Sequence, residues 1–163
     1  MEVLERITKF LNHVLIGIAG VFLVAMVGLT CADILSRLLW VPILGSVELV
    51  ALFGSVVTAF ALGYTQLRRG HIWVDVLVSL FPDRVKRGLN IINCLVCMGF
   101  FAIVAWRITV WSTTLVRTGE LTETLRIIYY PFSYAVALGC AVLCLVFLAE
   151  GLKSLISLKE NEK

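Results

Sequence analysis

The chain has 163 residues, of which 60% are apolar and 15% are charged, and its formal net charge is +3. Both fractions depart from the usage of soluble domains, as does the mean hydropathy of +0.98. The composition therefore indicates an integral membrane protein. A transmembrane helix takes about 20 residues, so four spans and their connections use the whole length and leave no room for a soluble catalytic domain.

Four apolar stretches predict the membrane spans, which cover residues 14–32, 47–67, 91–111 and 127–149. Each is long enough to cross a bilayer as a helix, and none shows the period-two alternation of a barrel strand. The predicted fold is an all-α integral membrane protein, with a single membrane domain over residues 1–163.

The distribution of Lys and Arg predicts the orientation of the four spans. The N-terminal segment, the connection between the second and third spans, and the C-terminal tail carry ten of these residues, whereas the other two connections carry three. Because positive residues are retained on the cytoplasmic side, we expect both termini and the central connection to be cytoplasmic.

Charged residues mark the helix ends on the opposite side. Asp33 and Arg37 are four apart, so on a continuing helix they would lie on one face and could pair. Glu48 opens the second span, where a carboxylate meets the positive end of the helix dipole. Two interpretations remain open: these charges cap helices at the water border, or they form polar contacts inside an assembly.

Small residues follow the second span at intervals of four: Ala51, Ser55, Ala59 and Gly63. Helices associate in lipid where small residues let their backbones approach. The stripe is therefore a predicted helix-packing face, and its neighbour is either another helix of this chain or a second protein.

Arg107 interrupts the third span about one turn before Trp111. We expect its side chain to extend outward to the lipid headgroups. The alternative is a buried contact with a helix of a partner protein.

The connection between the second and third spans predicts a short interfacial helix over residues 71–81. Its apolar residues recur at helical spacing and Pro82 ends the segment. Basic residues at 84, 86 and 87 would meet anionic headgroups, so phospholipids are an expected partner. No nucleic-acid partner is expected.

Motifs of catalysis and metal binding are sparse, and we predict no catalytic, substrate-binding or metal site. The pair Cys94 and Cys97 has a redox spacing, but lipid does not supply the electropositive setting that activates a thiolate. A haem-bearing four-helix anchor would need two histidines, and the chain has only His13 and His71. An independent small transporter is the other alternative, and it would need an ionisable residue deep in a span.

Over nearly its whole length, the sequence resembles the small membrane subunit (DctQ type) of tripartite ATP-independent periplasmic (TRAP) transporters. The resemblance rests on the four-span plan, on the charges that close the first span and open the second, and on the motif Arg-x-Gly-His-Ile-x-Val-Asp. In this chain the motif residues are Arg68, Gly70, His71, Ile72, Val74 and Asp75. A proline preceded by an apolar residue and followed by basic residues comes next, with Phe81 where the family more often has Leu.

The resemblance implies a role without chemistry of its own. The expected partners are a large sodium-coupled permease subunit in the bacterial inner membrane and a periplasmic protein that binds an organic acid. The small subunit would brace the large one and help dock the binding protein, binding no cofactor itself. Residues implied in partner or structural contacts are Asp33, Arg37, Glu48, Arg68, Gly70, His71 and Asp75.

Overall fold

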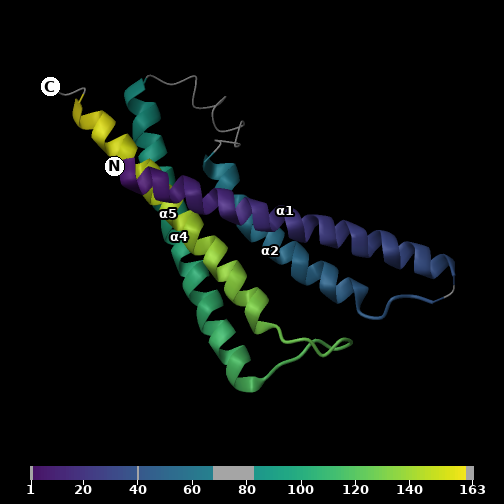
Figure 1. The fold of residues 1–163 in the computed structure, drawn as a ribbon. Coiled ribbons are helices and arrows are strands. Elements are labelled where there is room, and N and C mark those ends of the chain that lie inside the picture. The colour runs from purple at the N-terminus through teal and green to yellow at the C-terminus, as the bar shows by residue number, and fades with distance from the viewer. Residues whose placement is uncertain (1, 40, 68–82, 161–163) are drawn as a thin grey trace.

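The computed structural model describes residues 2–39, 41–67 and 83–160, and these form an all-helical fold (Figure 1). All four helices are long and apolar enough to cross a membrane, as predicted. The predicted interfacial helix over residues 71–81 lies outside the described residues. The helices are α1 (Glu2–Leu38), α2 (Ser46–Leu67), α4 (Asp83–Thr118) and α5 (Tyr130–Glu160).

Three of the helices run well past the apolar stretches that predict them. Once a helix has formed, each further residue adds a hydrogen bond without a new nucleation cost, so a helix continues until a residue breaks it. The α1 helix begins near the N-terminus, α4 continues from Trp111 to Thr118, and α5 continues to Glu160. Gly119 follows α4 directly and adopts a positive φ of 66°, which ends the helix.

The helices pair as two hairpins, α1 with α2 and α4 with α5. The two hairpins diverge from each other toward the ends at which α1 connects to α2 and α4 connects to α5 (Figure 1). The α5 helix also packs against α2 and, less extensively, against α1. Within the most apolar windows, 39% of α5 and 33% of α2 is buried, against 11% of α1 and 6% of α4. The α2 and α5 helices therefore form the centre, and α1 and α4 flank them.

The two hairpins meet along a line of contacts that we call the α2–α5 seam. Its members are the ring pair Phe53–Phe132, with centroids 6.3 Å apart, the close pair Ala59–Gly139, and the pair Gln66–Glu150, joined by a hydrogen bond of 2.8 Å. The three contacts follow the same order along both helices, so α2 and α5 run parallel. The main core cluster surrounds the seam and contains Leu15, Ala19, Val56, Ala59, Phe60 and Val142.

The middle of the seam depends on the missing side chain of Gly139. A Cβ atom added there would lie 2.8 Å from the carbonyl oxygen of Ala59 and 3.0 Å from its Cβ. Real Cβ atoms do not approach backbone this closely, so any larger residue separates α2 from α5. This is the close backbone approach that small residues permit in membrane helices.

We predict that Gly139→Ala lowers the free energy of unfolding by about 1–3 kcal/mol, because the two backbones must separate. The matched control is Gly17→Ala on α1, where an added Cβ meets nothing within 4 Å. That control should be neutral or gain up to about 1 kcal/mol from helix propensity. Unfolding in detergent, followed by helical circular dichroism, measures both variants, and equal stability of the two would contradict the seam contact.

Candidate functional site at the loop end of the bundle

The connections 39–45 and 119–129 lie at the same end of the bundle, which we call the loop end. The first joins α1 to α2 and the second joins α4 to α5 (Figure 1). Two carboxylates at this end, Asp33 and Glu48, each bind backbone N–H groups of a connection. Together they tie the ends of the helices to the loops between them.

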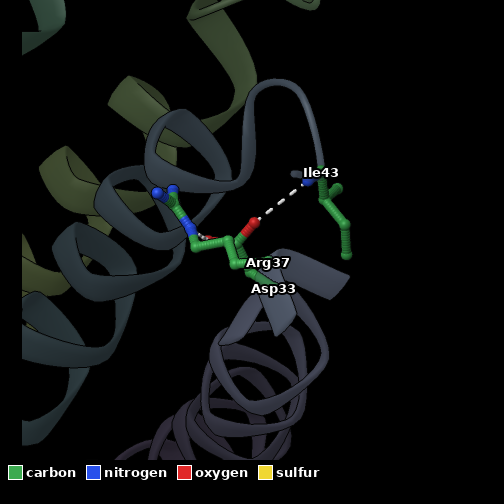
Figure 2. A network of polar contacts seen from close by, with 3 residues as sticks. All are labelled: Asp33, Arg37 and Ile43. Carbon is green, nitrogen blue, oxygen red and sulfur yellow. Dashed lines mark hydrogen bonds and ion pairs between the residues drawn. The ribbon is translucent and has the colours of Figure 1, made fainter. Parts of the chain in front are cut away.

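Asp33 anchors the first connection to the last turn of α1 (Figure 2). Its Oδ2 accepts a hydrogen bond from Arg37 Nε at 2.9 Å, and its Oδ1 accepts one from the Ile43 backbone N–H at 3.1 Å. The carboxylate is therefore satisfied on both oxygens although Asp33 is buried. Its i,i+4 pairing with Arg37 is the geometry that the sequence spacing favours.

Arg37 is the exposed member of this pair. Its side chain is 58% exposed, against 12% for Asp33. Figure 2 shows its two terminal guanidinium nitrogens pointing away from the carboxylate, which only Nε contacts. The other four of the five guanidinium N–H groups are thus not used in holding the connection. An exposed ion pair of this kind contributes little stability.

Glu48 reaches across to the other connection. One carboxylate oxygen accepts the Thr124 N–H at 2.8 Å and the other accepts the Leu125 N–H at 3.2 Å. Bonds from N–H groups to a charged carboxylate are stronger than neutral ones. The structure thus places Glu48 in a contact between the hairpins, in addition to its position in the first turn of α2.

The second connection is itself folded as a small hairpin. Leu121 and Ile128 form an antiparallel bridge, and Thr122 accepts from the Ile127 N–H through its side chain at 3.0 Å. Arg126 adopts a positive φ of 53°, which closes the turn. The hairpin therefore has a defined shape before any partner binds.

A packing contact between the connections supports the Glu48 bonds. Gly45 has a positive φ of 79°, and an added Cβ at this position would overlap the side chain of Leu125. Glycine is needed here both for the turn into α2 and for the space that Leu125 occupies. The two connections consequently pack directly against each other.

The predicted stripe of small residues on α2 divides between two environments. Ala59 and Gly63 are buried, and Ala51 and Ser55 are exposed. The physical reason is the helical repeat of 3.6 residues, because a strict spacing of four rotates each successive residue by about 40°. The buried face of α2 instead contains Leu52, Val56, Ala59, Phe60 and Gly63.

The opposite end of the bundle holds polar contacts that the sequence reasoning missed. Asn12 is fully buried, donates to the Thr8 carbonyl at 2.9 Å, and directs its Oδ1 against Gly63. That oxygen has no hydrogen-bond partner in the part of the chain that the structure describes. The signal was present in the i,i+4 spacing of Thr8 and Asn12, but both precede the apolar stretch that predicts the first span.

The remaining predicted contact residues, Arg68, Gly70, His71 and Asp75, lie outside the described residues. Among the residues that are described, no group of three or more His, Cys, Asp or Glu side chains is placed to hold a metal ion. The loop-end carboxylates accept from backbone and guanidinium donors, which is an arrangement for holding loops together.

Comparison with known proteins identifies the family. Residues 26–156 match the family model described as tripartite ATP-independent periplasmic transporters, DctQ component. The chain belongs to the DctQ family. No curated protein and no solved structure gives a significant match.

Family membership sets the biological context of this fold. A DctQ component is a transporter subunit rather than an enzyme, and the chain is a multi-pass protein of the bacterial inner membrane. Membership also implies two partners, the large membrane subunit (DctM) and a periplasmic binding protein.

We predict that Glu48→Ala loosens the second connection, because the Thr124 and Leu125 N–H groups lose a charged acceptor. Amide hydrogen exchange at these two positions should accelerate by roughly tenfold or more. Glu120→Ala, at an exposed position on the same connection, is the control and should leave both rates unchanged. Unchanged exchange in Glu48→Ala would show that this carboxylate does not hold the connection.

Proposed function

We propose that this DctQ chain braces the stationary part of its large permease subunit and presents the loop end to the periplasmic binding protein during organic-acid import. The observation that carries this proposal is the α2–α5 seam. A subunit that braces a moving partner must itself keep one shape.

Three kinds of contact support a single shape. Aromatic and backbone packing joins α2 to α5 in the middle of the seam, Gln66 bonds Glu150 at one end, and Glu48 bonds the second connection at the other. Because these contacts are spread over the whole length of α2, relative motion of the hairpins would break several of them together.

The Lys and Arg distribution supports a cytoplasmic location for both termini and the connection between α2 and α4. In that orientation the loop end faces the periplasm. The short connections there carry few Lys and Arg residues, as expected for that side.

The hairpin of the second connection is the part proposed to contact the binding protein. Glu120, Glu123 and Arg126 are exposed on it. Its internal hydrogen bonds and its bonds to Glu48 fix these residues before a partner arrives, so little conformational entropy is lost on contact.

The chain is proposed to bind no cofactor, with the sodium gradient used by the large subunit. His13 Nδ1 donates to the Lys9 carbonyl at 3.1 Å, and the His13 ring stands edge-on to Tyr64. A haem-bearing anchor would be favoured only if the purified chain showed haem absorption. An independent transporter would be favoured only if this chain moved solute without the large subunit.

The test is uptake of an organic acid by cells that produce the large subunit and the binding protein, with or without this chain. We expect omission to abolish uptake and to reduce the amount of large subunit in the membrane. In cells that lack the wild-type chain, the Gly17→Ala variant should restore uptake fully, and the Gly139→Ala variant should restore it only in part. Undiminished uptake without this chain would contradict the bracing role.

A further inference from the structure

The α4 helix leaves most of its apolar surface uncovered by the other described parts of the chain. Only 6% of its most apolar window is buried. The uncovered side includes bulky side chains that are mostly more than half exposed, and one charge lies among them. These residues are Ile92, Val96, Phe100, Ile103, Arg107 and Val110.

Arg107 lies far from both ends of the apolar part of α4. At a rise of about 1.5 Å per residue, it is about 16 Å from Thr118 and about 24 Å from Ile91 along the helix axis. The helix passes Trp111 without interruption, so Trp111 does not end the span.

The polar residues after Trp111 do not require water. Ser112 donates to the Ile108 carbonyl at 2.8 Å, and Thr113 and Thr114 both donate to the Val110 carbonyl. Hydroxyls bonded to their own helix are compatible with apolar surroundings. This stretch of α4 can therefore lie within the membrane, which places Arg107 deeper than its spacing from Trp111 suggests.

No carboxylate in the described part of the chain pairs with Arg107. The two carboxylates described above at the loop end, Asp33 and Glu48, already accept hydrogen bonds from other donors. A guanidinium at this depth is costly without an anionic partner, and intramembrane charges pair with groups of a neighbouring helix.

The exposed side of α1 provides the comparison within the same chain. Phe10, Val21, Val24 and Leu35 are all more than 60% exposed there. No Asp, Glu, Lys or Arg occurs between Lys9 and Asp33. Lipid chains can cover such a surface without cost, so of the two uncovered helices only α4 carries a feature that lipid chains do not match.

We propose that the exposed face of α4 packs against a transmembrane helix of the large permease subunit and that Arg107 pairs with a carboxylate on that helix. This inference rests on the proposed function, because it names the contact through which bracing occurs. Trp106 and Trp111, which are 69% and 55% exposed, flank Arg107 on α4. Exposed Trp beside Arg is the composition that dominates binding energy at protein interfaces.

A protein carboxylate fits the position better than a lipid phosphate. Phosphates lie outside the hydrocarbon layer, which is about 30 Å thick, whereas Arg107 lies about 4 Å along the helix axis from the midpoint of the apolar stretch Ile91–Thr118. Gly99 is on the same helix, and an added Cβ there meets nothing within 4 Å. A partner helix can thus approach closely eight residues before Arg107.

The test is copurification of the large subunit with tagged forms of this chain in mild detergent. We expect the wild type to retain the large subunit, and Arg107→Gln and Arg107→Leu to retain at least about tenfold less, because a partner carboxylate is left buried and unpaired. Arg107→Lys should retain an intermediate amount. Arg117→Gln, on the same helix near its end, is the control and should match the wild type.

Each alternative outcome is distinguishable. Wild-type copurification with unchanged retention in Arg107→Gln and Arg107→Leu would overturn the Arg107 contact and leave the bracing role intact. The same result with loss of copurifying phospholipid would assign Arg107 to a lipid phosphate, which also overturns it. Absence of the large subunit from the wild-type sample would contradict both proposals. Circular dichroism and gel filtration of the isolated variants show whether each remains folded.

Discussion

The close approach of α2 and α5 is the constraint on which the rest of the structure depends. Each hairpin alone is a pair of antiparallel helices, and the contact of Gly139 with Ala59 forms the middle of the seam that joins them. The polar contacts then follow from that placement. Gln66 can reach Glu150, and Glu48 can reach the second connection, only because parallel α2 and α5 bring these groups to matching heights. Packing in the middle and hydrogen bonds at both ends therefore stabilise the same arrangement.

Much of this fold was predictable from the sequence, because lipid imposes one dominant rule. A chain with four long apolar stretches has to form four helices, since no other spanning structure satisfies the backbone of such stretches. The same reasoning predicts the Asp33–Arg37 pair, which needs only a continuing helix and a spacing of four. The family was also recognisable from the sequence, because its motif is a short run of neighbouring residues.

Contacts between distant segments were not predictable in the same way. Glu48 and Thr124 are 76 residues apart, and nothing in either segment indicates that α2 begins beside the second connection. The packing role of Gly139 depends on which face of α5 meets α2, and the sequence of α5 alone does not indicate that face. Asn12 was missed because helices continue beyond their apolar stretches, so polar residues before a span still become buried.

The central claim is that the two hairpins move as one body. It is tested most directly by the distance between spin labels on Leu38, at the end of α1, and Thr118, at the end of α4, in a background that lacks the five native cysteines. Measurements in lipid nanodiscs should compare the chain alone with the complex containing the large subunit, sodium and loaded binding protein. The account predicts one narrow distance distribution that stays unchanged in the complex. A broad distribution, or two populations whose proportions change with sodium or substrate, would contradict it.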